Sequence, residues 1–297
     1  MLNLNFSSIK GSFAKDGIGV KLLLLLLFFI VYALAFSGVA KGVVALFGVT
    51  DSLAVLKITQ FCQALGMFVL AALSLAYLVS KNMREYLSLD VRPTHIVIVL
   101  TIACIWLSMP LVNFIGEWNA SLSLPDSMGR LETLFREMED AAERLTLKML
   151  VTDSFFQFFL NIVVMALLPA VGEELFFRGV MQNSIERSAK NEHVAVWITA
   201  AVFSFVHFQF FGFVPRLLLG AFLGYLLCWS RSLIVPMVAH FVNNATIVTI
   251  YYMYSDDAKK MEEAERFGCD DYSVLLISAL AFIVAAVSVW KRSRAEE

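Results

Sequence analysis

Two adjacent glutamates and an arginine follow a long apolar run in the middle of the chain. Glu173 and Glu174 follow the apolar run 155–171 after a single glycine, Gly172, and Arg178 lies four residues beyond Glu174. Placing one charged side chain at the centre of a bilayer costs about 2.5–3.5 kcal/mol on insertion scales, so such groups in apolar segments usually serve a function. The alternative is a purely structural cluster of ion pairs at a helix end.

Helical geometry separates the roles of the two glutamates. Glu174 and Arg178 stand at positions i and i+4, so they share a face and are predicted to pair. Glu173 is rotated by about 100° from Glu174. A carboxylate left without a partner in a site of low dielectric suits a general base. We therefore expect Arg178 to neutralise Glu174, while Glu173 stays available for chemistry.

Two later apolar segments each carry a histidine beside other notable side chains. His207 shares a helical face with Phe203, and His240 shares one with Asn244, with Asn243 next to it. A single histidine in a helix is more often a packed core residue than a catalytic one. The coincidence of both histidines with further polar groups favours a common site.

These residue types support three kinds of chemistry. A carboxylate and a histidine can activate a water molecule, while the second histidine and an amide stabilise an oxyanion. Alternatively, Glu173, His207 and His240 form a ligand set that suits zinc with one open position, although the short HExxH spacing is absent. The third option is a pathway for protons or ions. A nucleophilic Ser204 is disfavoured, because no GxSxG context surrounds it.

The three elements together resemble a known family of membrane proteases. The patterns EExxxR, FxxxH and HxxxN on successive helices are similar to those of the CAAX protease and bacteriocin-processing family, also called CPBP or Abi. They comprise Glu173, Glu174 and Arg178, then Phe203 and His207, then His240 and Asn244. The motif-bearing segment runs from about residue 154 to 254, and residues 1–150 carry no motif.

The resemblance implies a role for each motif residue. Glu173 and His207 would activate the attacking water, and His240 with Asn244 would stabilise the tetrahedral oxyanion. Glu174 and Arg178 match the motif and are expected to support the others. Members of the family have been described both as metalloproteases and as glutamate proteases, and some cleave prenylated CAAX proteins. We expect a mechanism that requires no cofactor, with zinc as the alternative.

The composition is that of an integral membrane protein. Of 297 residues, 59% are hydrophobic and only 16% are charged, whereas soluble domains have about 25% charged residues. The net charge of −2 argues against nucleic acid as a partner. Four scattered cysteines without a CxxC spacing argue against a disulfide scaffold or a cysteine metal site. We expect a multi-pass protein of the bacterial inner membrane.

Hydropathy predicts an all-α, polytopic bundle of about eight transmembrane helices. Short basic segments before the first span, between later spans and after the last one all fall on one side of this arrangement, which places both termini in the cytoplasm. The first apolar run is long enough to span the membrane rather than to serve as a signal-peptide core. The chain is interpreted as a single membrane domain, residues 1–297. The expected spans are 20–40, 55–80, 95–116, 154–174, 194–211, 215–230, 233–254 and 273–290.

Two segments on the outer side differ from simple loops. Residues 125–150 are charged and amphipathic, with apolar residues recurring every three or four positions, so a helix on the bilayer surface or over the mouth of the bundle is expected. A role in gating substrate is the alternative. Residues 255–271 are mostly acidic and are expected to be solvated.

The sequence therefore predicts an intramembrane endopeptidase that acts on a membrane-associated protein or peptide, in contact with membrane lipid. Two other classes of membrane protein could carry the same polar residues. One is a non-enzymatic membrane protein, such as a bacteriocin self-immunity or scaffold protein. The other is a proton- or ion-coupled transporter, although paired repeats and broken helices typical of transporters are not evident in the sequence.

Overall fold

The computed structural model describes residues 9–295, and within that range every regular element is a helix. This confirms the prediction of an all-α membrane bundle. The α-helices are α1 (Ile18–Leu46), α2 (Ser52–Ala64), α3 (Ala71–Val79), α4 (Met83–Tyr86), α5 (His95–Ala120), α6 (Gly129–Leu150), α7 (Phe155–Asn161), α8 (Leu168–Glu174), α9 (Asn183–Ala189), α10 (Glu192–Phe205), α11 (Phe213–Ser230), α12 (Ile234–Tyr254), α13 (Ala258–Glu265) and α14 (Tyr272–Arg294).

Short turns of other helical types extend or join these elements. The π-helical segments η2 (Leu65–Leu70), η4 (Ile162–Leu167) and η5 (Leu175–Gln182) lie inside otherwise continuous helices. The 3₁₀ turns η3 (Asp126–Met128) and η6 (Phe210–Gly212) precede α6 and α11. Because π-helical turns are rare and are often found at functional sites, η5, directly after the two glutamates, marks this helix as unusual.

Seven helices are long and apolar enough to cross a membrane among the residues that the structure describes. They include the composite helices Ser52–Val79 and Phe155–Ala189. The predicted fifth span, 194–211, is the exception, because α10 has only 14 residues and ends at Phe205. The chain turns there, and Phe208 adopts a left-handed conformation with φ 52°, which a regular helix excludes. His207 therefore lies in a turn and not within a span.

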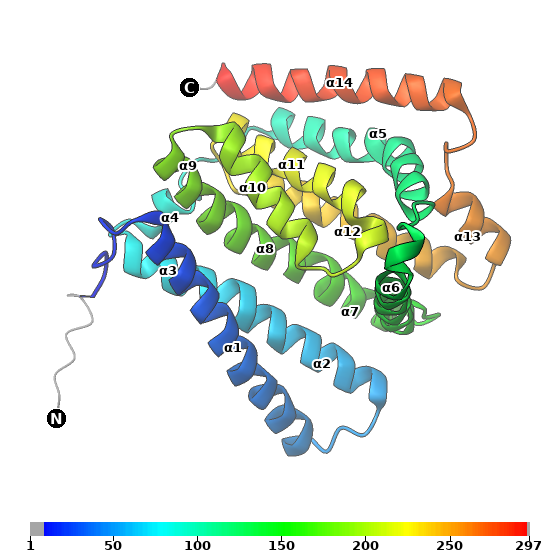
Figure 1. The fold of residues 1–297 in the computed structure, drawn as a ribbon, viewed down its shortest axis with the longest axis horizontal. Helices are drawn as coiled ribbons and strands as arrows, with labels where there is room; N and C mark the ends of the chain where they lie inside the picture. Colours follow the sequence, from blue (N-terminus) through cyan, green and yellow to red (C-terminus); the bar gives the residue numbers. More distant parts are fainter. Residues whose placement is uncertain (1–8, 296–297) are drawn as a thin grey trace.

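The helices form a bundle with a recognisable centre (Figure 1). Helices α5 and α14 pack along one side, α1 and α2 pair along the other, and α10, α11 and α12 lie between them. The start of α1 and the end of α14 lie at one end of the bundle, and α6 and α13 at the opposite end (Figure 1). The three motif-bearing elements are therefore central rather than peripheral.

Local sequence signals explain where several helices begin and end. The side chains of Asp51, Ser154 and Asn191 each accept a hydrogen bond from a backbone N–H in the first turn of the following helix, as N-cap residues do. Helices α9 and α11 end at Lys190 and Arg231, both in the left-handed conformation. A left-handed residue stops the helical hydrogen-bond pattern and turns the chain back.

Aromatic packing fixes the long helix of the glutamates against the N-terminal pair. Phe176 contacts Phe29 of α1 and Phe68 of η2, with ring centroids 5.6 and 5.7 Å apart. The close approach of the N-terminal helices depends on Gly66, where an added Cβ would lie 2.6 Å from the Phe36 ring. Residues 18–79 thus pack against the glutamate helix, although they carry no motif.

The predicted amphipathic helix is confirmed as α6. Its exposed face carries most of its charges, and only Met149 and Leu150 at its end are fully buried. The acidic segment 255–271 contains the short helix α13, which is largely exposed.

Candidate active site

The predicted pairing of Glu174 with Arg178 is confirmed. Arg178 Nη1 lies 2.7 Å from Glu174 Oε1, and both side chains are completely buried. The same guanidinium donates through Nη2 to the backbone carbonyl of Gly220 at 2.9 Å. Its carbon lies 4.6 Å from the centre of the Phe203 ring. Arg178 therefore connects the glutamate helix to α10 and α11.

Glu174 also binds His240, a contact that the sequence did not predict. His240 Nδ1 donates to Glu174 Oε1 at 2.8 Å, and His240 is only 4% exposed. One carboxylate oxygen thus receives hydrogen bonds from two motif residues, while Glu174 Oε2 and Arg178 Nε are buried without a hydrogen-bond partner among the described residues. We call Glu174, Arg178 and His240 the buried triad.

A glycine pair on α11 makes the buried triad possible. An added Cβ at Gly220 would lie 3.2 Å from Ala200 and Phe203, and one at Gly224 would lie 2.8 Å from Gln182 Oε1. Small residues four positions apart let helices in membranes approach closely and expose backbone carbonyls. The carbonyl of Gly220 is consequently within reach of Arg178.

Glu173 has a different environment from its neighbour. It lies at the end of α8 and is half-buried, and no hydrogen bond or ion pair to its carboxylate is present in the part of the chain that the structure describes. The carboxylate interacts electrostatically with His240, Arg178 and Arg216. Glu173 thus lies near two arginines and His240 as well as the adjacent Glu174, while both of its oxygens remain available to a ligand or water.

His207 is held by a single local hydrogen bond. Its Nδ1 donates to the carbonyl of Phe203 at 2.7 Å. Its ring lies 5.0 Å from the Phe203 ring, which in turn lies 6.0 Å from the His240 ring. Because Nδ1 is occupied in both histidines, each presents Nε2 for chemistry. Phe203 is the common neighbour of His207, His240 and Arg178.

Asn244 lies one turn after His240 on the same face of α12 and is half-buried. Its Oδ1 accepts a hydrogen bond from Asn243 Nδ2 at 3.1 Å. This contact fixes the amide of Asn244 so that its NH₂ group is the free end. We call Glu173, His207 and Asn244 the open trio, because each retains unoccupied polar atoms.

Arg216 was missed in the sequence analysis. It lies near the start of α11 and interacts electrostatically with Glu173 and His207. Its Nη2 donates to Gln209 Oε1 at 2.7 Å, which closes the turn between α10 and α11. The available signal was its position as the single charged residue of the apolar segment 210–230.

The residues named as zinc ligands do not form a ligand set here. Among residues 9–295, no three His, Cys, Asp or Glu side chains are gathered so that they could hold a metal ion. A catalytic zinc site requires three such ligands within about 2.0–2.3 Å of the ion. Glu173, His207 and His240 in this arrangement do not fit a metal, so no step below passes through one.

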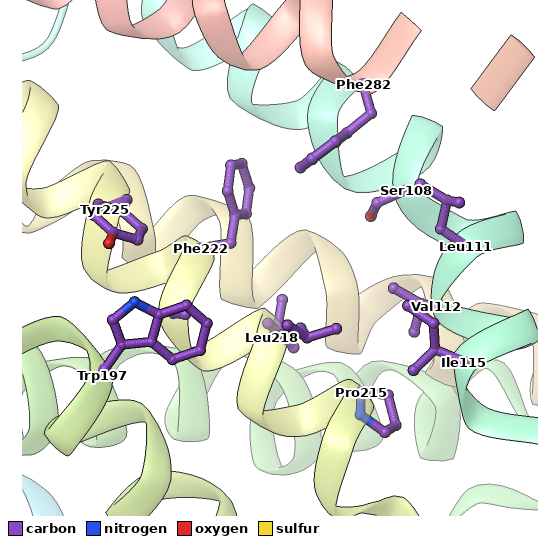
Figure 2. A pocket seen from close by; sticks show the side chains of 12 residues that line it. Ser108, Leu111, Val112, Ile115, Trp197, Pro215, Leu218, Phe222, Tyr225 and Phe282 are labelled. Atoms are coloured by element: carbon purple, nitrogen blue, oxygen red, sulfur yellow. The ribbon is translucent and has the colours of Figure 1, made fainter. Parts of the chain in front are cut away.

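A separate apolar cavity lies beside α11 (Figure 2). It has a volume of about 340 Å³ and contains none of the motif residues. Figure 2 shows Phe222 and Leu218 of α11 facing it, with Phe282 of α14 and Trp197 of α10 at its edges. Of the residues that line it, Ser108 and Tyr225 carry hydroxyls, and the others are apolar or aromatic. The polar cluster and this cavity are therefore distinct features.

Comparison with protein families agrees with the geometry. Residues 155–246 match the family described as "Type II CAAX prenyl endopeptidase Rce1-like". This segment is similar to Rce1-like domains. It includes all six residues of the buried triad and the open trio. Residues 1–150 lie outside the matched segment.

A curated relative is similar to part of the chain. "Uncharacterized protein YpbD" of Bacillus subtilis (strain 168) is 32% identical over 89 residues, which are 29% of this chain and 42% of the relative. The match thus spans less than half of the length of that relative. No solved structure matches the chain significantly.

Proposed function

We propose that the protein is an intramembrane endopeptidase that hydrolyses a peptide bond with a water activated by Glu173 and His207. The observation that carries this proposal is the division of the motif residues into a closed group and an open group. The buried triad fixes the framework, and the open trio keeps one carboxylate, one imidazole nitrogen and one amide NH₂ free. These are a base, a second water anchor and an oxyanion donor.

Water activation is assigned to the first two groups. The Glu173 carboxylate takes a proton from water, and His207 accepts a second hydrogen bond through Nε2, because its Nδ1–H already donates to Phe203. The resulting hydroxide attacks the carbonyl carbon of the substrate. Glu173 then passes the proton to the leaving nitrogen as the C–N bond breaks, so the products are a carboxylic acid and an amine.

Stabilisation of the oxyanion is assigned to α12. His240 donates Nδ1–H to Glu174, which fixes the imidazole ring, and in the proposed step Nε2 of the same ring carries a proton that it donates to the oxyanion. The NH₂ group of Asn244 supplies a second donor. Donors that are held in place before the reaction stabilise the transition state without reorganising, which makes this contribution large.

The substrate is proposed to be a protein or peptide that is itself associated with the membrane. The site lies within a bundle of apolar helices, so a soluble protein would have no simple route to it. The family description names CAAX prenyl endopeptidases. A prenylated substrate with a CAAX-type end is accordingly the first class to test.

The proposal is tested with purified protein in liposomes. Wild-type protein should cleave a membrane-anchored reporter peptide, and the Glu173→Ala variant should not. Ion flux across the same liposomes is measured in parallel. Ion flux without cleavage of the reporter would contradict the protease proposal and indicate a transporter. Comparative proteomics of cells that carry wild-type or Glu173→Ala protein then identifies the substrate as the membrane protein that stays uncleaved in the variant.

A further inference from the structure

The turn that carries His207 is held by the amphipathic helix α6, which no motif includes. We propose that α6 positions His207, and that Glu139 is the residue through which it does so. This inference rests on the proposed function, because it assigns a positioning residue to the same reaction. It gives α6 a task beyond lying on the surface of the bundle.

His207 needs such support because it does not belong to a helix. Helix α10 ends at Phe205, and the next regular element, η6, begins at Phe210. Between them the chain turns through a left-handed Phe208. The bond from His207 Nδ1 to Phe203 fixes the tautomer, but the position of the ring also depends on residues 206–212. Anything that orders this turn therefore places the imidazole.

Three side chains of α6 contact the end of that turn. The ring of Phe135 stacks on Phe210, with centroids 3.8 Å apart. The guanidinium of Arg136 lies 3.9 Å from the centre of the Phe211 ring. Glu139 Oε2 accepts a hydrogen bond from the backbone N–H of Phe211 at 3.0 Å. The stack and the cation–π contact bind side chains, whereas Glu139 binds the backbone itself.

Glu139 also faces Arg216, which interacts electrostatically with Glu173. At Gly212, an added Cβ would lie 3.2 Å from Arg216 Nη2 and 3.6 Å from Glu139 Oε1. The two opposite charges therefore approach the same point of the turn, and Arg216 interacts electrostatically with both Glu139 and Glu173. Glu139 thus accepts a hydrogen bond from the backbone of the turn and attracts Arg216, whose bond to Gln209 closes the turn.

Helix α6 is itself braced at its start. Glu132 accepts the backbone N–H of Leu124 at 2.8 Å and pairs with Arg136 at 2.8 Å. Arg136 donates in turn to the carbonyl of Leu122 at 3.0 Å. These bonds hold the first half of α6 against the linker that follows α5. The helix can therefore act as a fixed support for the turn and not merely as a mobile cover.

The test compares three single variants in the full-length protein. Glu139→Ala removes the acceptor, Glu139→Gln keeps an acceptor for Phe211 N–H, and Glu137→Ala removes an exposed charge from the same helix. We expect Glu139→Ala to lower kcat by roughly 10- to 100-fold, because misplacing a group by about 1 Å costs up to that factor. KM should change less than about twofold, and Glu139→Gln should restore most of kcat. Glu137→Ala should equal the wild type.

Hydrogen exchange gives a readout that does not need activity. Amides of residues 206–212 should exchange faster in Glu139→Ala than in the wild type or in Glu137→Ala, while those of α12 stay unchanged. Unchanged exchange in this turn, or a kcat equal to that of Glu137→Ala, overturns the positioning role. A loss confined to KM also overturns it, as does an equal loss in the Gln variant. If wild-type protein cleaves no substrate but the exchange result holds, the proposed function fails and the support of the turn stands.

Discussion

The buried triad and the open trio use the same kinds of side chain for opposite purposes. Glu174 is completely buried and bound by both Arg178 and His240, whereas the adjacent Glu173 is half-buried and makes no bond to a described residue. One glutamate is a structural anion, and the other is free to exchange protons. A position along a helix therefore decides the role as much as the residue type does.

The same contrast holds for the two histidines. His240 donates Nδ1–H to a carboxylate and sits inside a helix, whereas His207 donates to a backbone carbonyl and sits in a turn. The comparison predicts that changes in the triad damage folding and activity together. Changes in the trio should damage activity alone.

The largest expected effect on activity comes from Glu173→Gln. This variant keeps the shape of the side chain but removes the base, so cleavage should fall to background. Because Glu173 makes no hydrogen bond or ion pair with a described residue, the melting temperature in detergent should fall much less than in variants of the buried triad. Turnover at the wild-type rate by the purified variant would remove Glu173 from the reaction.

The next effect, on stability, is expected from breaking the triad. Glu174→Ala or Arg178→Ala leaves a buried charge without its partner, which costs about 3–5 kcal/mol of folding free energy. Unfolding by denaturant in lipid micelles measures this cost, and expression should fall in parallel. The double variant serves as the control, since it removes both charges and should lose less than the two single losses combined. Strict additivity in this cycle would contradict the pairing.

Asn244→Ala tests the other end of the trio. Loss of one oxyanion donor costs about 10²–10³ in kcat, and KM should change much less because the donor acts mainly in the transition state. Thermal stability should again be unaffected. An unchanged kcat would show that the oxyanion lies elsewhere.

A smaller effect is expected from Asn243→Ala. This change removes the donor to Asn244 Oδ1, so the amide of Asn244 can rotate, and kcat should fall by about tenfold if the bond contributes roughly 1.4 kcal/mol to its orientation. In the Asn244→Ala background the same change should have no further effect. An equal loss in both backgrounds would show that Asn243 acts independently.

No change at all is expected from stringent chelation. We expect a metal-independent mechanism, because the motif residues divide into a water-activating pair and an oxyanion pair that leave no full ligand set. Elemental analysis should find no stoichiometric zinc, and activity should survive chelators. Stoichiometric zinc, with activity lost on its removal and restored on its return, would recast Glu173, His207 and His240 as ligands.

Contacts within one helix could be predicted from the sequence, and contacts between helices could not. The pair Glu174–Arg178 follows from helical periodicity alone. The bond from His240 to the same glutamate joins residues 66 positions apart, and no local pattern encodes it. The spans that correspond to α1, α5 and α12 could be predicted because each is a long apolar run. Hydropathy measures the transfer of a segment into lipid, so it predicts which segments span the membrane but not how the helices pack.

The error at the fifth span has a physical cause of the same kind. Most residues from Val206 to Phe213 are apolar, with His207 and Gln209 as the polar ones, so hydropathy predicts a longer helix. The left-handed backbone at Phe208 and the support from α6 end it early instead. Helix α6 itself was recognised from its periodicity, but its contact with the turn depends on tertiary packing.

The π-helical segment η5 determines where the chain can lose a residue without moving the site. A π turn holds one more residue than an α turn, so deleting a single residue from 175–182 would let the segment relax into a regular α-helix. That deletion would leave the faces of α8 and α9 in nearly the same relative register, because only the extra residue of the π turn is lost. A deletion within α8 itself would instead rotate the residues on its two sides by about 100° relative to one another. Asn183 anchors α9 to the carbonyl of Tyr86 at 2.9 Å, so homologous chains should tolerate the loss of one residue from η5 better than the loss of one residue from α8.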